Sequence, residues 1–313
     1  MNSSTTATAR RFTAAEFRDR RDRLQDRMAA ERLSCLVVTA PEDVYYLAGL
    51  EYQGYFSFTS AILGRDESTL TLVARAMEQP TVTAQVPDCR FIGYGDDADP
   101  AETLAGVLTE FSLPTGRVGY QPTSLSFPIA VWRDTDRRLT DVEWVDATAL
   151  PAGARMERGD TELCCVRDAA SLSDVGMNAG IEAVRPGAAE SQVAAAILAA
   201  MVGAGSDQPG FVPLVRTLDR IDQDHLSWSN RCFEADETVL LELSGSVARY
   251  HAPLSRTVPV NPDAAPNEAV DIAHVGMAAI RAALRPGNSY SAVYRGWRHA
   301  VSRALGYDYQ RHH

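Results

Sequence analysis

An internal repeat in the second half of the chain constrains the fold more than any other feature. Residues 175–193 and 275–293 are identical at ten of nineteen positions, at an offset of one hundred residues. Both copies contain Val-Gly-Met and, ten residues further on, Arg-Pro-Gly. Proline and glycine end helices, so each copy predicts a helix that stops at Arg-Pro-Gly and is followed by another helix. The repeat indicates a duplicated α/β unit, and by analogy such duplications place the site between the halves.

Two strands are predicted between the copies. Residues 239–245 form a nearly unbroken apolar run, typical of a strand buried on both faces, with one carboxylate at Glu242. A glycine turn at the end of this run leads into a second strand over residues 250–258. An acid inside an apolar strand is costly unless it is paired or has chemistry to perform. On residue type alone, Glu242 is as readily an acid paired with Arg249 or Arg256 as a functional group.

The first half predicts a small α/β domain, because strand and helix patterns alternate there. A chain of 313 residues is also long enough for two domains. A Leu-Pro-Ala-Gly sequence at residues 150–153 is interpreted as the linker between them. The expected elements are helices at 14–32, 41–47, 100–111, 159–184 and 190–202, and strands at 33–39, 60–63, 69–73, 91–94 and 117–120.

The charge composition excludes several kinds of site. All 30 basic residues are arginine, which rules out a lysine Schiff base, a lysine nucleophile and a P-loop. The net charge is -11 and no basic stripe is present, so nucleic acid is not an expected partner. We also expect no membrane partner, because no apolar run has the length of a bilayer span and no signal peptide is visible. The five cysteines lack metal-ligand spacing, which predicts buried free thiols in a reducing cytoplasm.

Three segments together resemble a known superfamily. They are residues 36–49 (Leu-Val-Val-Thr-Ala-Pro-Glu-Asp-Val-Tyr-Tyr-Leu-Ala-Gly), residues 182–187 (Glu-Ala-Val-Arg-Pro-Gly) and the pair Arg256-Thr257. They are similar to creatinase, aminopeptidase P, prolidase and methionine aminopeptidase, whose catalytic domain has the pita-bread fold. The resemblance covers nearly the whole chain and implies an α/β (α+β) protein. It implies a creatinase-like N-terminal domain at 1–150 and a pita-bread catalytic domain at 151–313, expected to be incomplete because the family continues with further strands.

The second strand departs from the metal-dependent members. Those peptidases carry an aspartate in the first strand and another eleven residues later, and here the positions hold Glu242 and Pro253. Proline offers no side-chain donor atom, so we expect no metal and no other cofactor. Creatinase itself is a metal-free member. The run Glu-x-x-Gly…Arg-Tyr-His-x-Pro-Leu-Ser-Arg-Thr most resembles bacterial ectoine hydrolases, which open the cyclic amidine ring of ectoine to acetylated diaminobutyrate.

The resemblance assigns catalytic roles to three residues. Glu242 is expected to attack the substrate or to activate a water molecule. His225 occupies the position of the family's substrate-facing histidine and is expected to transfer a proton, although a loop histidine alone is commonly a solvated residue. His251 is the third candidate. Strand alternation places Tyr250 and His251 on opposite faces, so one should face the site while the other packs away.

Three residues are candidates for substrate binding. Arg256 could clamp a substrate carboxylate or serve as the internal partner of Glu242. Trp228 could cover an amidinium group, with core packing as its alternative. Tyr250 is the third, if it faces the site. An aromatic cluster could also reach a pocket, of this subunit or of a neighbour, or form an ordinary core or dimer contact; its members are Tyr52, Tyr55, Phe56 and Phe58.

The sequence predicts a cytoplasmic, metal-independent hydrolase that acts on a C–N bond of a small zwitterionic molecule. Ectoine is the expected substrate and a homodimer the expected assembly. One alternative is a Xaa-Pro aminopeptidase or dipeptidase with a degraded metal site, against which Pro253 argues. Another is a catalytically inactive member of the fold that binds a small solute.

Overall fold

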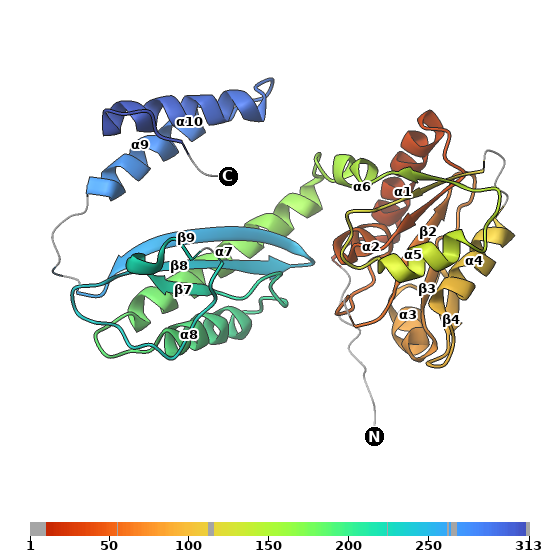
Figure 1. Ribbon diagram of the computed structural model, residues 1–313, viewed down its shortest axis with the longest axis horizontal. Helices are drawn as coiled ribbons and strands as arrows, with labels where there is room; N and C mark the ends of the chain where they lie inside the picture. The colour runs from red at the N-terminus through yellow and green to blue at the C-terminus, as the bar shows by residue number, and fades with distance from the viewer. Residues whose placement is uncertain are drawn as a thin grey trace. The chain divides into compact units, whose positions relative to one another are not determined.

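The computed structural model describes residues 11–54, 56–111, 116–223, 225–261, 263 and 268–310 (Figure 1). The chain divides into two compact units that interleave along the sequence. The first comprises Met1–Ala179, Ala196–Pro213 and Glu242–Ser255, and the second comprises Gly180–Ala195, Leu214–Leu241 and Arg256–His313. These interleaved units do not test the predicted boundary between an N-terminal and a catalytic domain at residue 150, which stays a prediction.

The first unit contains a six-stranded sheet with the order β4-β3-β2-β1-β5-β6. The β1–β2 and β2–β3 pairs are antiparallel, whereas β1–β5, β3–β4 and β5–β6 are parallel. The strands predicted at 60–63 and 69–73 are therefore confirmed, and they pair with each other. The strands are β1 (Cys35–Val38), β2 (Ser60–Gly64), β3 (Thr71–Arg75), β4 (Arg90–Tyr94), β5 (Arg117–Tyr120) and β6 (Glu143–Asp146).

Helices cover both faces of this sheet (Figure 1). Strand β1 shows the reason, since Leu36 and Val38 point into one hydrophobic cluster while Cys35 and Val37 point into the other. Such a strand is buried on both faces, as its unbroken apolar run predicted. The helices are α1 (Ala14–Ala30), α2 (Pro41–Ala48), α3 (Gln79–Gln85), α4 (Pro100–Glu110), α5 (Ile129–Asp136) and α6 (Ala149–Ala154), with a 3-10 turn, η1, at Ala76–Glu78.

The predicted linker at residues 150–153 is wrong, because these residues lie inside helix α6. Pro151 stands in the first turn of that helix, where no intrahelical hydrogen bond needs its missing N–H. Leu150 and Ala154 are buried with Leu24 and Met28 of α1 in one cluster. The hydroxyl of Tyr46 also donates to the carbonyl of Ala154 at 3.3 Å. Packing against α1 therefore overrides the proline and glycine signal.

The repeated sequences form the same pair of helices twice. The first pair is α7 (Asp160–Ala183) and α8 (Glu190–Gly203), and the second is α9 (Glu268–Ala283) and α10 (Tyr290–Leu305). The two Arg-Pro-Gly sequences end α7 and α9, and their glycines, Gly187 and Gly287, have φ angles of 80° and 90°. The predicted helices are confirmed, and both need a glycine because L side chains rarely adopt such angles.

The packing inside each helix pair is equivalent as well. A Cβ on Gly176 would lie 2.5 Å from Met201 and 3.5 Å from Ile197 of α8. A Cβ on Gly276 would lie 3.0 Å from Val301 and 2.8 Å from Trp297 of α10, again one hundred residues further along the chain. The shared glycine thus lets both helix pairs approach closely at the same position.

A second sheet has the order β7-β8-β9, with β7 at Leu214–Thr217, β8 at Thr238–Val247 and β9 at Tyr250–Pro259. In β8 the side chains of Val239, Leu241 and Leu243 are buried, whereas Leu240 and Glu242 are half-buried. The prediction that the apolar run is buried on both faces is therefore wrong for this part of β8.

The turn between β8 and β9 also lies elsewhere than predicted. Ala248 and Arg249 have φ angles of 51° and 61°, as in a two-residue hairpin turn, while Gly245 lies within β8. A Cβ on Gly245 would stand 2.4 Å from the carbonyl oxygen of Ala169 in α7. This glycine therefore serves close packing of a strand on a helix rather than a turn. Ser173 of α7 joins the two as well, accepting from the Gly245 N–H at 2.7 Å and donating to the Ala252 carbonyl at 2.6 Å.

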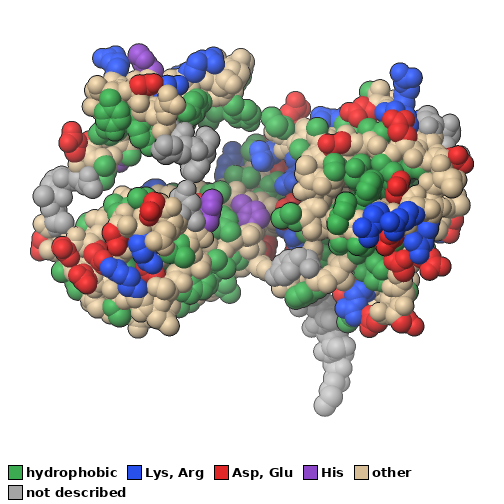
Figure 2. Space-filling model, in the orientation of Figure 1, with side chains coloured by type: hydrophobic (Ala, Val, Ile, Leu, Met, Phe, Trp, Pro, Cys, Tyr) green, Lys and Arg blue, Asp and Glu red, His purple; other side chains and the backbone are tan. Residues whose placement is uncertain are grey.

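Acidic and arginine side chains are mixed over the face shown in Figure 2. Among the described helices, none has both the length and the apolar character that crossing a bilayer requires. The cysteines are free, as predicted, but Cys164 and Cys232 are exposed, so the expectation that all are buried is wrong for these two.

Candidate functional site

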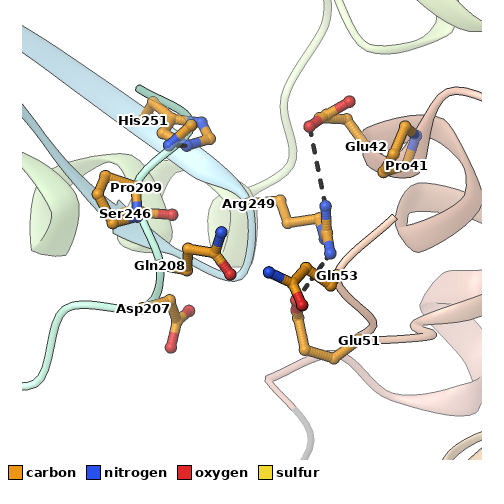
Figure 3. Close-up of a pocket in the computed structure, with 11 residues that line it drawn as sticks. Pro41, Glu42, Glu51, Gln53, Asp207, Gln208, Pro209, Ser246, Arg249 and His251 are labelled. Atoms are coloured by element: carbon orange, nitrogen blue, oxygen red, sulfur yellow. Dashed lines mark hydrogen bonds and ion pairs between the residues drawn. The ribbon is translucent and has the colours of Figure 1, made fainter. Parts of the chain in front are cut away.

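A polar pocket lies at the turn between β8 and β9, entirely within the first unit (Figure 3). Its volume is about 140 Å³. Three segments line it: residues 41–53 at and after helix α2, the loop at 207–210 after α8, and the tip of the β8–β9 hairpin. Two of the predicted strands thus meet the N-terminal half of the chain at a cavity rich in charged side chains.

Arg249 occupies the turn and is bound by the N-terminal segment. Its guanidinium lies 3.0 Å from the Glu51 carboxylate and 3.8 Å from that of Glu42, and it donates to the Tyr52 carbonyl. Figure 3 shows this side chain extending from the hairpin toward both acids. The predicted alternative in which Arg249 pairs with Glu242 is therefore wrong, because Arg249 pairs with Glu51 and Glu42 instead.

Asp207 holds the turn from the other side. Its carboxylate accepts from the Ala248 N–H at 2.6 Å, and its own N–H donates to the Ser246 carbonyl at 2.9 Å. A left-handed conformation costs a residue other than glycine roughly 1 kcal/mol. The bonds from Asp207 help to offset that cost at Ala248.

His251 faces the pocket, and its imidazole is already engaged there. Its Nε2 accepts a hydrogen bond from the Gly210 N–H at 3.0 Å, which requires an unprotonated Nε2. Burial lowers the pKa of His251 from its ordinary value; the negative charge of Glu42 and a hydrogen bond to the backbone of Arg249 oppose this, and the positive charges of Arg249 and Arg155 reinforce it. A proton-transfer role for His251 would require release of the loop that carries Gly210.

Tyr250 points the other way, into the core of the first unit. Its ring packs near Phe12, and its hydroxyl donates to the Glu162 carboxylate at 2.5 Å. Burial first, and then this bond to Glu162, raises the pKa of Tyr250. Arg20 lies 3.7 Å from the same carboxylate, with its guanidinium 4.0 Å from the centre of the Phe12 ring. Of the two residues, the geometry turns His251 to the pocket and gives Tyr250 a structural role.

Glu242 lies on the polar face of the hairpin. Alternation places it on the same face as Ser246 and opposite to the buried Leu241 and Leu243. A two-residue turn sets Ser246 opposite His251, and residues that face each other across a strand pair share a face. Glu242, Ser246 and His251 therefore share one face. The exposed Pro253 follows His251 on it, because it is two residues further along β9.

Three other predicted site residues belong to the second unit. His225 is exposed with a φ angle of 58°, and Trp228 is half-buried; both lie between β7 and β8. Arg256 is exposed on β9, where alternation gives it the same side of the strand as Tyr250. Glu242 and His251 therefore share one face of the hairpin but lie apart along it, since His251 lines the pocket and Glu242 does not. The other three residues belong to the second unit.

Sequence reasoning missed Glu190, a fully buried acid that fixes the segment carrying His225 and Trp228. Its carboxylate accepts from the N–H and the hydroxyl of Ser229, at 2.8 and 2.7 Å. It also pairs with Arg220 of the short 3-10 helix η2 (Leu218–Arg220). The repeat offered one signal. The equivalent position of the second copy holds Tyr290, so the shared pattern of the two helix pairs does not itself require an acid at position 190.

The predicted aromatic cluster is only partly together. Phe58 is buried in the core, whereas Tyr52 and the exposed Phe56 line a second cavity of about 300 Å³. Tyr55 lies outside the described residues.

Two family models account for nearly the whole chain. The model described as Creatinase/Prolidase N-terminal domain matches residues 20–157, and the model described as Metallopeptidase family M24 matches residues 164–313. The chain belongs to the superfamily of creatinase, aminopeptidase P and prolidase. Its fold is accordingly a creatinase-type N-terminal α/β domain followed by a domain of the pita-bread type, and it is a hydrolase of this superfamily.

Individual members of the superfamily are distant from this chain. An uncharacterized hydrolase/peptidase from Sinorhizobium fredii is 26% identical over 307 residues, covering 93% of this chain and 78% of the relative. An ectoine hydrolase from Halomonas elongata is 24% identical over 265 residues, covering 79% of this chain and 66% of the relative. The crystal structure of a prolidase from Thermococcus sibiricus superposes with a TM-score of 0.80 at 19% identity, covering 95% of this chain and 80% of the other.

The metallopeptidase relatives imply a metal, and the described residues do not fit one. Pro253 stands where the second acid would be, and a proline side chain cannot coordinate a cation. Within the part of the chain that the structure describes, no three histidine, cysteine, aspartate or glutamate side chains gather closely enough to hold a metal ion.

Proposed function

We propose that this chain hydrolyses a non-peptide C–N bond in a small zwitterionic molecule, with a cyclic amidine such as ectoine as the substrate. The observation that carries the proposal is the position of Glu242. Its half-buried carboxylate lies on the polar face of β8, and Pro253 replaces the acid that would share a metal with it. The similarity to an ectoine hydrolase, over 79% of this chain, supports the same substrate class.

A carboxylate without a metal can open an amidine ring by general-base catalysis. Glu242 takes a proton from a water molecule as the water oxygen bonds to the amidine carbon, which gives a tetrahedral intermediate. Collapse of that intermediate breaks one C–N bond and forms an amide, and the departing nitrogen takes up the proton to leave as an amine. The atoms of substrate and water are conserved in the acetylated diamine.

The remaining roles in this proposal rest on sequence position within the superfamily. His225 relays the proton from Glu242 to the departing amine, and Trp228 covers the amidinium; Arg256 is given no substrate contact, because strand alternation places it on the side of β9 opposite to Glu242. The geometry gives His251 and Tyr250 other contacts, so we propose that they support the hairpin rather than react.

Proton NMR of the full chain incubated with ectoine, with and without a chelator, tests the proposal. We expect ring opening that the chelator leaves unchanged. The Glu242→Gln variant should lose about 10²- to 10⁴-fold in kcat while its thermal unfolding stays as in the wild type, because the amide keeps the shape but cannot accept the proton. The matched control is Asp236→Asn, which neutralises an exposed acid in the turn just before β8 and should keep full activity.

Other outcomes would select a different function. Chelator-sensitive cleavage of a Xaa-Pro dipeptide, without ring opening, would overturn the proposal and favour the peptidase reading that the family model suggests. Saturable binding of ectoine without turnover would instead favour an inactive solute-binding member of the superfamily. Undiminished turnover in Glu242→Gln would remove this residue from the mechanism.

A further inference from the structure

We propose that the pocket at the β8–β9 turn binds a small organic cation that carries N–H groups, such as an ammonium or an amidinium. This site is separate from the reaction proposed at Glu242. Ser246 in this pocket is four positions further along β8 than Glu242, which corresponds to about 13 Å. A ligand held at Ser246 and small enough for a cavity of about 140 Å³ does not reach the reacting carboxylate.

The unpaired hydroxyl of Ser246 points to a ligand. Its side chain is only 1% exposed, and its hydroxyl has no hydrogen-bond partner among the described residues. Figure 3 shows that hydroxyl turned into the pocket. The backbone of the same residue is satisfied, since its N–H donates to the Ser206 hydroxyl and its carbonyl accepts from the Asp207 N–H. A buried hydroxyl without a partner is costly, so a ligand that bonds to it gains affinity from that deficit.

The charges around the pocket determine the sign of the ligand. Glu42, Glu51 and Asp207 contribute three negative charges and Arg249 one positive charge, which leaves an excess of two negative charges. His251 adds none, because its Nε2 accepts a hydrogen bond from Gly210. Glu51 and the Tyr52 carbonyl already bind Arg249, so the guanidinium is not presented to an anion. A cation is therefore the favoured occupant.

The donor and acceptor types select an organic cation with N–H groups. The side chain of Gln208 adds a carbonyl acceptor to the carboxylates and to the Ser246 oxygen. Several acceptors at separate places around a cavity match the diverging N–H bonds of an ammonium or an amidinium. A quaternary ammonium has no N–H and would leave these acceptors unpaired.

Isothermal titration of the full chain with acetamidinium chloride tests this proposal, with thermal unfolding as a second readout. We expect saturable binding and a rise in Tm. Choline chloride and sodium chloride at equal ionic strength should give neither. Ser246→Ala should raise the Tm of the ligand-free protein, because it removes an unsatisfied polar atom, and should weaken acetamidinium binding about tenfold.

Two further variants make the result specific. Ser244→Ala is the matched control, because Ser244 is equally buried on the same strand but its hydroxyl bonds to the Gly245 carbonyl. It should bind acetamidinium as the wild type does. Asp207→Asn keeps an oxygen for the Ala248 N–H but loses the charge, and it should weaken binding as well. Absence of saturable binding in the wild type, equal binding by Ser246→Ala and Asp207→Asn, or equal binding of choline would each overturn the proposal.

Discussion

The imidazole Nε2 of His251 accepts the backbone N–H of Gly210 at 3.0 Å and so ties strand β9 to the loop that follows helix α8. This bond exists only while Nε2 is unprotonated, because a protonated ring would present a second donor to the same N–H. The contact makes part of the stability of the hairpin tip depend on the charge of one side chain.

Stability should therefore fall as the solution becomes acidic. Burial lowers the pKa of His251 in the folded protein below its ordinary value of 6.5, so the unfolded chain takes up this proton first. The contribution is fully present above a pH of about 6.5 and is lost as the pH falls toward the folded pKa. Urea unfolding between pH 7.5 and pH 5 measures it. His251→Gln, whose side-chain oxygen can still accept from Gly210, should show a smaller decrease; identical pH profiles would contradict this account.

Tyr250→Phe should destabilise the first unit by about 1–3 kcal/mol, because it leaves the buried Glu162 carboxylate without its hydroxyl donor. Equilibrium urea denaturation measures the change. The control is Tyr290→Phe, which removes a hydroxyl from an exposed ring and should change the free energy of unfolding by less than about 0.5 kcal/mol. Equal effects of the two substitutions would argue against a structural role for Tyr250.

Ala248→Gly should stabilise the protein by up to about 1 kcal/mol, because glycine adopts the left-handed conformation of the turn without strain. The same change at Ala252, which lies in the extended strand β9, should instead destabilise by about 0.5–1 kcal/mol. Thermal unfolding of both variants separates the two effects. A loss of stability at both positions would show that the turn carries no relievable strain.

Gly245→Ala should destabilise by about 1–3 kcal/mol, because the new methyl group would stand 2.4 Å from the Ala169 carbonyl and would push β8 away from α7. Gly106→Ala offers the opposite case. That glycine lies on the exposed side of helix α4 with no described atom within 4 Å of its Cβ position, so alanine should stabilise by about 0.5–1 kcal/mol. Chemical denaturation of this pair distinguishes a packing glycine from a merely permissive one.

Local patterns in the sequence were sufficient for most elements of the fold. Helix α1 begins after Thr13, whose side chain forms a capping box with Glu16, and helix α2 ends at Gly49 with a φ angle of 71°. Both signals act within a few residues and do not depend on the rest of the chain. Strand β6 and helix α5 were missed, because short segments such as Glu143–Asp146 carry too little periodicity to be recognised.

The candidate site depended on longer-range relationships. The sequence identified Glu242 and Pro253 as the unusual pair of the hairpin, and alternation left Tyr250 and His251 open. Only tertiary contacts resolved that alternative, because Glu162, 88 residues from Tyr250, holds its hydroxyl, and Gly210, 41 residues from His251, holds its imidazole.

The sequence by itself determined the superfamily, the duplicated helix pairs and the presence of a proline at position 253, since each depends only on residue identity at a fixed spacing. The tertiary structure decided where the hairpin turns and what surrounds it. Gly245 attracted the turn prediction, yet close packing on α7 needs that glycine in the strand. The turn therefore falls on Ala248 and Arg249, whose unfavourable backbone angles persist because Asp207, Glu51 and Tyr52 bind the turn from distant parts of the chain.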